Sequence, residues 1–579
     1  MMSRKIFGMA LLCLMVSQVC RSQEINKDQD SYLIEDSVLI GINNGGTLSA
    51  VVVRKKGITV PQPAALMFFI YSNLERSLAE AKSAADHGYV GIVADTRGKR
   101  LSPDVVEPYE HEAKDVNAVI DWIVKQPWSN GQVGMYGGSY SGFAQWAATK
   151  YLHPALKTIV PYVAAIPGLG LPMENNIFLN ANYQWAFYVT NNKYTDNAVN
   201  NDHRRWRNMR DSWYQSGKAY NRIDSIDGTS NPWLQRWLLH PDYDSYWQGM
   251  VPYQSDFARI NIPVLSITGY YDDGQISALH YLREHYKYNP MANHYLIIGP
   301  YDHFGAQQGG AAVLRGYQVD SVALINTREI TFQWLDYVMK GGKKPELLKD
   351  RINYEVMGTN RWEHVGSIEK MADTVLTLYL DKTKLHSDFS LSDKRPVKSG
   401  SIEQTIDLAD RNTSNNDYYP DPIGKKELNR DNGLFFISKP FDRPVSINGM
   451  FSGVLKASIN KKDMDIGLVL YEVLPNGEYF QLSYFMGRAS YAEDMSKRKL
   501  LRPGKIEVIP FERSRMVSKL LNKGSRLLVV LNVDKNSFAQ VNYGTGKDVS
   551  LETIEDAAEP LKIRWYTDSF IQVPMRMKL

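Results

Sequence analysis

The segment VGMYGGSYSGF, residues 133–143, constrains the fold of this chain more than any other stretch. It places an apolar strand, a turn of small residues and the helical run FAQWAATKYL in direct succession, with no room for a longer loop. A turn this tight needs small residues two places before and two places after its centre, and Gly137 and Ser141 meet that need around Ser139. Although Ser141 breaks the strict Gly-x-Ser-x-Gly pattern, the strand–turn–helix setting predicts a nucleophile elbow with Ser139 at its tip.

Buried strands and helices alternate on both sides of this segment, which indicates an α/β fold with a largely parallel sheet. The chain opens with a predicted hairpin around Asn43 to Gly46, and helices are expected at residues 73–87, 115–126, 277–288 and 327–339. The sheet domain is predicted to comprise residues 30–165 and 259–345. Residues 166–258, which are aromatic and polar, are predicted to form a helical cap inserted between its two halves.

The pattern changes at the C-terminal side of the sheet domain. Short alternating segments such as VLKASI, DIGLVLYEV and RLLVVLNV are separated there by Gly, Pro, Asn and Asp. Strands of this length and spacing are typical of two packed antiparallel sheets. We therefore expect a C-terminal β-sandwich over residues 350–579.

The first 22 residues predict a signal peptide. Arg4 and Lys5 precede an apolar run, Ile6 to Val19, that is shorter than the roughly 20 residues of a membrane-spanning helix. We expect cleavage of residues 1–22 and export to the periplasm or the exterior; a retained anchor and a lipid-modified Cys20 are the alternatives. Cys13 and Cys20 are the two cysteines of the sequence, so the mature chain would contain no disulfide.

The charge of the mature chain would be close to neutral. When Arg4, Lys5 and Arg21 leave with the signal, 64 of the 67 Lys and Arg side chains remain against 63 Asp and Glu. This balance gives no reason to expect nucleic acid or an anionic membrane surface as a partner. We also expect no integral membrane span after signal cleavage.

Two later segments supply partners for a serine nucleophile, which needs a base that a carboxylate orients. Asp272 follows the strand PVLSITG in the sequence GYYDDG, and His303 follows the strand HYLIIG in GPYDHFG. The chain order Ser, Asp, His, with each residue after a strand, is the order of α/β hydrolases. The alternative for Asp272 and Asp273 is that they cap the following helix.

An oxyanion hole requires donors aimed at the developing negative charge. The backbone N–H of Tyr140, next after Ser139, is one candidate. Tyr71, at the end of the apolar run ALMFFIY, could supply the second donor from its phenol or could simply pack at the rim. The sequence leaves both interpretations of Tyr71 open.

These segments resemble a known family. GGSYSG fits the elbow, GYYD the acid site and GPYDH the histidine site of the CocE/NonD hydrolases, which include cocaine esterase, α-amino-acid ester hydrolases and the X-Pro dipeptidyl-peptidase (S15) relatives. VADTRGKRLS, LHPDYDSYW and DMDIGLVLYEVLPNGE are also similar to that family, so the resemblance covers nearly the whole mature chain. One departure is that relatives usually read Arg-x-Pro-Tyr where this chain reads Phe-Phe-Ile-Tyr.

The resemblance implies an α/β-hydrolase domain, a helical cap and a C-terminal domain of jelly-roll type. It also implies catalytic roles for Ser139, Asp272 and His303, with the Tyr140 amide and the Tyr71 phenol as the oxyanion hole. A small-molecule ester or amide, or a short peptide, would be cleaved through an acyl-enzyme intermediate. Neither a metal nor an organic cofactor is implied, and the sequence contains no HExxH or Walker motif.

Two questions about function stay open at this stage. An aminoacyl or dipeptidyl (X-Pro-like) substrate would need a carboxylate for its free amine, and the candidates in the cap are Glu174, Asp196, Asp202, Asp211, Asp242 and Asp244. The alternative to an enzyme is a catalytically weak binding protein whose jelly roll engages a carbohydrate or cell-wall ligand. The intact Ser, Asp and His argue against that alternative.

Overall fold

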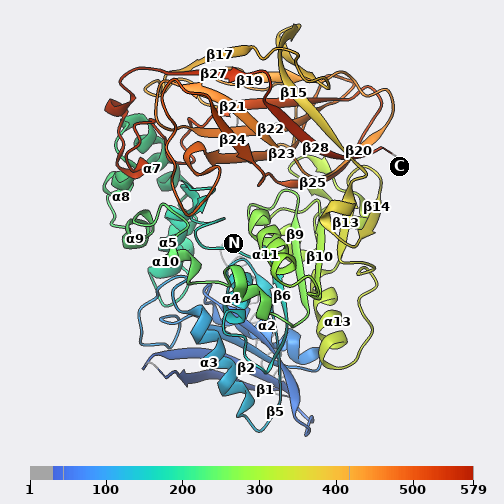
Figure 1. Ribbon diagram of the computed structural model, residues 1–579. Helices are drawn as coiled ribbons and strands as arrows, with labels where there is room; N and C mark the ends of the chain where they lie inside the picture. Colours follow the sequence, from blue (N-terminus) through green and yellow to red (C-terminus); the bar gives the residue numbers. More distant parts are fainter. Residues whose placement is uncertain (1–29, 44, 416–417, 578–579) are drawn as a thin grey trace, which may run out of the picture.

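The computed structural model describes residues 30–43, 45–415 and 418–577, so the predicted signal peptide lies outside the described residues. Figure 1 shows a sheet domain at the bottom, helical segments at one side of it and a domain built from strands at the top. The predicted fold class is confirmed: a mixed sheet flanked by helices is joined to a separate all-strand C-terminal domain.

The sheet of the first domain has ten strands in the order β1-β2-β4-β3-β5-β6-β9-β10-β13-β14. Strands β4 to β13 in that order run parallel, whereas β1, β2 and β14 pair antiparallel with their neighbours. The bounds are β1 (Tyr32–Gly41), β2 (Thr47–Lys55), β3 (Gln62–Phe69), β4 (Val90–Asp95), β5 (Ser129–Gly138), β6 (Leu156–Tyr162), β9 (Val264–Gly269), β10 (His294–Gly299), β13 (Ile352–Val356) and β14 (Arg361–Val365). Because the parallel strands end at one edge, the loops after β3, β5, β9 and β10 meet there.

Two strands join a different sheet from the one that the sequence suggested. β13 pairs in parallel with β10, and β14 pairs with β13, so residues 352–365 extend the first sheet although we expected the C-terminal domain to begin at residue 350. The side chains of INYEV in β13 are buried throughout. A short buried strand has the same residue pattern in either kind of sheet, so the pattern alone does not decide which sheet it joins.

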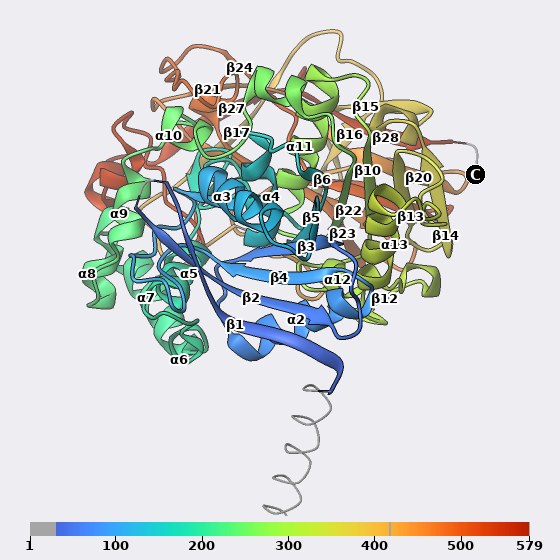
Figure 2. The ribbon, with the colours of Figure 1, turned by 90° about the horizontal axis from the view of Figure 1, so that it is seen from below.

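Helices cover both faces of this sheet. α3 (Glu112–Val124), α4 (Tyr140–Thr149) and α11 (Gln275–Tyr288) pack on one face, and α2 (Leu74–Asp86) and α13 (Thr327–Met339) pack on the other. Figure 2 shows α3 and α4 on the opposite side of the strands from α2. α2 begins where we expected, because the side chain of Asn73 accepts a hydrogen bond from the N–H of Arg76 and so caps the helix.

The inserted segment is mainly helical. Its elements are β7 (Met173–Glu174), β8 (Ile177–Phe178), α5 (Ala181–Thr190), α6 (Asn197–Asn200), α7 (His203–Ser216), η1 (Tyr220–Arg222), α8 (Ile223–Asp227), α9 (Pro232–Leu238), α10 (Ser245–Gln248) and η2 (Gln254–Arg259). Trp206, Trp213, Trp237 and Trp247 are buried. Most of the tryptophans that marked this segment in the sequence therefore belong to packed interior.

The C-terminal domain contains strands and short 3-10 turns. Its strands are β15 (Thr374–Leu385), β16 (Asp388–Ser392), β17 (Ser401–Ile406), β18 (Gly424–Lys425), β19 (Leu434–Ile437), β20 (Val445–Met450), β21 (Ser452–Ile459), β22 (Asp465–Val473), β23 (Tyr479–Arg488), β24 (Glu507–Phe511), β25 (Met516–Leu521), β26 (Arg526–Val533), β27 (Leu561–Tyr566) and β28 (Phe570–Arg576). The alternation read from the sequence thus corresponds to strands in β21, β22 and β26.

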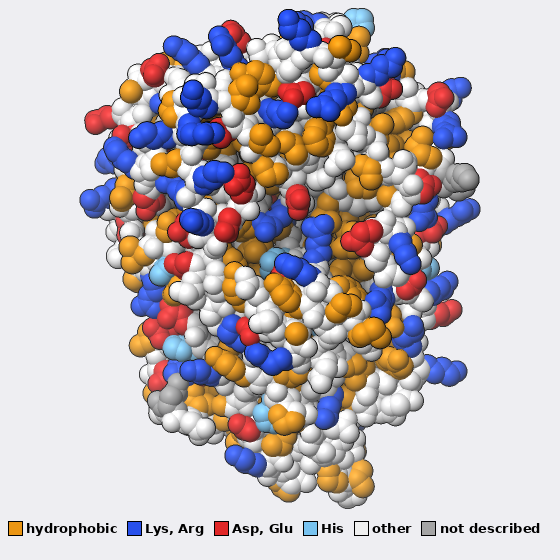
Figure 3. Space-filling view, in the orientation of Figure 1, with side chains coloured by type: hydrophobic (Ala, Val, Ile, Leu, Met, Phe, Trp, Pro, Cys, Tyr) orange, Lys and Arg blue, Asp and Glu red, His pale blue; other side chains and the backbone are white. Residues whose placement is uncertain are grey.

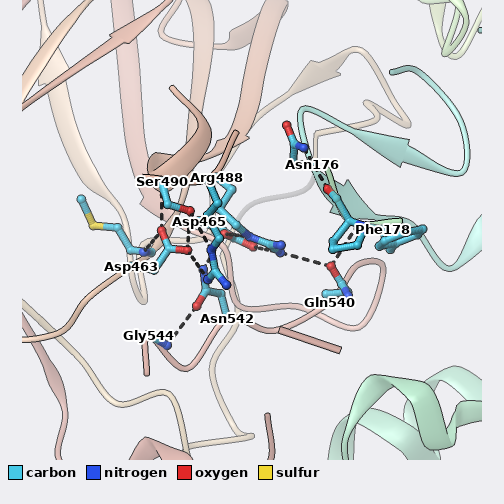
Figure 4. A network of polar contacts seen from close by, with 12 residues as sticks. Asn176, Phe178, Asp463, Asp465, Arg488, Ser490, Gln540, Asn542 and Gly544 are labelled. Atoms are coloured by element: carbon cyan, nitrogen blue, oxygen red, sulfur yellow. Dashed lines mark hydrogen bonds and ion pairs between the residues drawn. The ribbon is translucent and has the colours of Figure 1, made fainter. Parts of the chain in front are cut away.

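The β7–β8 hairpin of the cap docks on the C-terminal domain (Figure 4). The backbone N–H of Gln540 donates to the carbonyl of Phe178 at 3.0 Å, and the N–H of Phe178 donates to the side chain of Gln540 at 3.2 Å. Gln540 in turn accepts from Arg488, whose guanidinium forms a buried ion pair with Asp465. These bonds fix the base of the cap to the C-terminal domain.

The described residues contain no helix long and apolar enough to cross a membrane. Basic and acidic side chains are interspersed over the face seen in Figure 3. This distribution agrees with the nearly balanced charge of the sequence.

Candidate active site

Ser139 lies in the tight turn between β5 and α4, as the sequence predicted. Its φ of +60° and ψ of −118° place a non-glycine residue in a region that costs about 1–3 kcal/mol of backbone strain. Its neighbours must be small: a Cβ on Gly137 would lie 2.9 Å from the Cβ of Ser141, and one on Gly142 would lie 2.8 Å from the Cα of Ala164. The turn therefore holds the Ser139 side chain at the edge where the parallel strands end.

Tyr71, which follows β3, brings its phenol to this serine. The Tyr71 hydroxyl lies 3.2 Å from Ser139 Oγ and accepts a hydrogen bond from Trp185 Nε1 at 3.3 Å. Because Trp185 donates to the phenol oxygen, the phenol proton remains free to be donated. The sequence left open whether Tyr71 supplies a donor or packs at the rim, and in the structure its hydroxyl reaches Ser139.

Tyr140 is the first residue of α4, so its N–H has no acceptor one turn earlier in the helix. Its side chain is anchored beneath the site, where the phenol donates to Glu112 and accepts from the N–H of Tyr109 at 2.9 Å. Burial raises the pKa of Glu112 to about 7, although the bond from Tyr140 opposes this rise. No sequence pattern indicated Glu112, because a first-turn glutamate is ordinarily solvated.

Asp272 and His303, from the loops after β9 and β10, are in contact. His303 Nδ1 lies 2.9 Å from Asp272 Oδ1. Asp272 also accepts from the hydroxyl of Thr268 at 2.6 Å and from the N–H of Gly274 at 2.9 Å, and its side chain is fully buried. Burial raises the pKa of Asp272, while its bond to His303 opposes that rise. The carboxylate is thus positioned to orient the imidazole with Nε2 left free.

Asp273 is a second carboxylate at the same imidazole. Its Oδ1 lies 3.0 Å from His303 Nδ1, and its side chain is 51% exposed. Burial alone would lower the pKa of His303, but the charge of Asp273 and the hydrogen bond of Asp272 raise it well above its ordinary value. Partial burial would raise the pKa of Asp273, yet the charge of the neighbouring His303 holds it below its ordinary value. α11 begins after Gly274, so neither aspartate is its N-cap residue.

Ser139 and His303 line the same cavity, which has a volume of about 720 Å³. No hydrogen bond joins their side chains among the described residues. Catalytic hydrogen bonds are often long without substrate and tighten when it binds. The five residues expected at the site, Ser139, Asp272, His303, Tyr140 and Tyr71, therefore gather at one edge of the sheet.

Aromatic side chains form the wall of the cavity that faces the cap. Trp185 and Tyr188 come from α5, and the Trp185 ring stacks on Tyr109 with 5.4 Å between ring centroids. The Tyr188 ring lies 5.9 Å from that of Tyr71. An apolar, aromatic wall of this kind suits an acyl chain or an aromatic leaving group.

The cap carboxylates that we considered for an amine site do not line this cavity. Asp196, Asp202 and Asp244 cap helices α6, α7 and α10. Glu174 forms a buried ion pair with Arg515. Asp242 accepts a hydrogen bond from the Tyr491 phenol, and Asp211 lies beside Arg210. The carboxylates that line the cavity are Glu80 and Asp273. Sequence position could not separate capping residues from cavity residues.

The C-terminal domain supports the loop that carries Asp272 and Asp273. Arg515 donates to Glu174 at 2.8 Å and to the backbone carbonyl of Asp273 at 3.1 Å. The side chain of Gln275 donates to the carbonyl of Met516 at 3.0 Å and accepts from its N–H at 2.6 Å. These partners are 241 to 341 residues apart in the sequence, so no local pattern indicated them.

One cluster of histidine and carboxylates in the described part of the chain has the spacing of a metal site, and it consists of Asp272, Asp273 and His303. The same atoms already form the hydrogen bonds described above. Their arrangement is therefore accounted for by the orientation of His303.

Known proteins share both the sequence pattern and the fold. Residues 45–305 match the sequence model of the X-Pro dipeptidyl-peptidase (S15 family), and residues 348–561 match that of the X-Pro dipeptidyl-peptidase C-terminal non-catalytic domain. Cocaine esterase of Rhodococcus sp. (strain MB1 Bresler) is 22% identical over 91% of this chain and 95% of its own length.

Two solved structures have the same fold over nearly their whole length. An aminopeptidase from a marine sediment archaeon, Thaumarchaeota archaeon, has a TM-score of 0.77 at 20% identity and covers 94% of this chain and 96% of its own. An α-amino acid ester hydrolase has a TM-score of 0.76 at 22% identity and covers 94% of this chain and 97% of its own. The chain belongs to the CocE/NonD family of serine hydrolases, which combine an X-Pro dipeptidyl-peptidase (S15)-type catalytic domain with this C-terminal domain.

Proposed function

We propose that this chain is an exported serine hydrolase that cleaves an ester or amide through an acyl-enzyme intermediate, with Ser139, Asp272 and His303 as its catalytic triad. The observation that carries the proposal is the strained position of Ser139, with the Tyr71 hydroxyl 3.2 Å from its Oγ and with His303 on the wall of the same cavity. Export rests on the pattern of residues 1–22 and is tested by N-terminal sequencing of the mature protein.

Acylation begins when Nε2 of His303 removes the proton of Ser139, whose Oγ bonds to the substrate carbonyl carbon. Asp272, bonded to Nδ1, holds the imidazole in the required tautomer and stabilises its charged form. The negative charge that forms on the carbonyl oxygen receives hydrogen bonds from the Tyr140 N–H and the Tyr71 phenol. His303 then protonates the leaving oxygen or nitrogen as its bond to carbon breaks.

Deacylation repeats these steps with water. His303 removes a proton from the water molecule, whose oxygen bonds to the acyl carbon. The bond between that carbon and Ser139 Oγ then breaks, and the proton held by His303 returns to the serine. The acid is released and the site is ready for another substrate.

The test of the triad is labelling of the purified protein by a fluorophosphonate probe, which reacts with activated serines. We expect labelling and ester hydrolysis by the wild type, and loss of both in Ser139→Ala. Ser141→Ala is the matched control, since the Ser141 hydroxyl is buried and has no hydrogen-bond partner in the described structure. Labelling that persists in Ser139→Ala, or no labelling of the wild type, would contradict the proposal.

An aminoacyl or dipeptidyl substrate is a second, narrower proposal within the same chemistry. Two structurally similar proteins are described as an aminopeptidase and an α-amino acid ester hydrolase. In this chain the half-exposed Asp273 is the cavity carboxylate closest to the triad and would be the partner of a free amine. A screen of p-nitrophenyl esters, α-amino-acid esters, X-Pro anilides and β-lactam amides tests this, and turnover of simple esters alone would exclude it.

The alternative of a catalytically weak binding protein is not favoured by membership of a hydrolase family. A binding function also does not account for the contact between the Tyr71 hydroxyl and Ser139 Oγ. The labelling experiment separates the two functions directly.

A further inference from the structure

The charged side chains that line the Ser139 cavity are not all neutralised. They are Arg76, Glu80, Asp273, His303 and Arg328. Arg328 pairs with Glu80 at 2.9 Å, and Asp273 pairs with His303 at 3.0 Å. Arg76 has no carboxylate within 4.0 Å among the described residues. Among the described residues that line the cavity, Arg76 is therefore the one cation without a carboxylate at close range.

The side chain of Arg76 is exposed, and its guanidinium stacks on an aromatic ring. Arg76 lies in the first turn of α2, and its guanidinium lies over the Phe69 ring, 4.7 Å from the centroid. The Phe69 ring contacts Tyr71 edge-on at 5.7 Å, and Tyr71 reaches Ser139. Arg76 and Tyr188 line the same cavity. Aromatic contacts thus connect Arg76 to the nucleophile.

An unpaired guanidinium at a concave site is suited to an anion. Arginine presents a planar fork of N–H donors that matches a carboxylate with two parallel hydrogen bonds. Stacking on Phe69 orients the fork and reduces the entropy lost when it binds. In the cavity the other positive groups already have carboxylate partners, so a substrate anion would meet Arg76 first.

We propose that the substrate of this hydrolase carries a carboxylate, and that Arg76 binds it while Ser139 attacks the ester or amide. This inference rests on the function proposed above and narrows its substrate class. Arg76 would act in specificity and not in the chemical step, because it touches a group remote from the reacting carbonyl. Its effect should therefore appear in KM more than in kcat.

The test compares esters that differ in one terminal group. In the acyl series the substrates are the mono-p-nitrophenyl ester of adipic acid and its terminal carboxamide isostere. In the leaving-group series they are 4-carboxyphenyl and 4-carbamoylphenyl butyrate. In one of the two series we expect the wild type to have a kcat/KM about tenfold higher for the carboxylate substrate than for the carboxamide at low salt. A roughly tenfold ratio is what one well-formed hydrogen-bonded ion pair contributes. The preference should weaken as ionic strength rises.

The variant Arg76→Ala should lose this preference, because kcat/KM should fall about tenfold more on the carboxylate substrates than on their carboxamide counterparts, while fluorophosphonate labelling persists. Arg76→Lys should retain part of it, since the charge remains and the planar fork is lost. Arg351→Ala is the matched control, because that guanidinium also lies over an aromatic ring, Tyr286 at 5.1 Å, but does not line the cavity.

Absence of a carboxylate preference in both series, or a preference that survives in Arg76→Ala, would overturn the assignment of Arg76. Failure of the proposed function has a different signature. The wild type would then neither react with the fluorophosphonate nor hydrolyse the carboxamide esters.

Discussion

The substitution Tyr71→Phe removes one hydroxyl and leaves the ring that packs against Phe69 and Tyr188. The lost hydroxyl lies 3.2 Å from Ser139 Oγ and accepts a hydrogen bond from Trp185, so it is an oriented donor beside the proposed nucleophile. Loss of one oxyanion donor in serine hydrolases lowers kcat by about 10²–10³, or about 2.7–4 kcal/mol of transition-state stabilisation. We expect a loss of that size for Tyr71→Phe.

The assay is steady-state hydrolysis of a neutral p-nitrophenyl ester. Because the oxyanion forms only after attack, kcat should fall while KM changes little. Trp185→Phe should give a smaller loss, roughly fivefold to tenfold, because the phenol keeps its proton and loses one neutral hydrogen bond that orients it. Tyr253→Phe, which removes a phenol elsewhere in the cap, is the control. A Tyr71→Phe enzyme with at least half of the wild-type kcat would refute the role of Tyr71 and return it to rim packing.

Two further predictions concern the acid loop. Asp273→Asn removes a negative charge that raises the pKa of His303, so this pKa should fall. A larger fraction of the enzyme would then have a neutral His303 at a given pH. The acidic limb of the pH profile of kcat/KM should therefore move to lower pH. A limb that stays or moves to higher pH would contradict this. Arg515→Met leaves Glu174 buried without its partner and should lower the free energy of unfolding by about 3–5 kcal/mol in urea titrations. The double variant Glu174→Gln/Arg515→Met should recover part of the loss, and an equally unstable double variant would show that Arg515 stabilises the chain in another way.

The amino-acid sequence specified the local part of the site. Gly137, Ser139 and Gly142 occur within six consecutive residues, and their small side chains are what a tight turn between strand and helix requires. Asp272 and His303 were predictable for a related reason. Parallel strands end at one edge of a sheet, so residues that follow two buried strands must lie near each other.

Side-chain contacts between segments far apart in the chain could not be predicted from local sequence patterns. Three examples depend on which surfaces meet after folding: the contact of Asp273 with His303, the ion pair of Glu174 with Arg515 and the placement of β13 in the first sheet. The sequence likewise showed an aromatic cap, but not that α5 supplies its cavity wall while other tryptophans fill its interior.

What the sequence could and could not predict follows from the range of the interactions. Turn geometry and strand alternation act over a few residues, so the sequence by itself determined the fold class and predicted Ser139 as the candidate nucleophile, with Asp272 and His303 as its candidate partners. Cavity walls and ion pairs join residues up to several hundred positions apart, such as Glu174 and Arg515. Only the tertiary structure decided which charges are paired, and thereby left Arg76 as the unpaired cation of the described cavity wall.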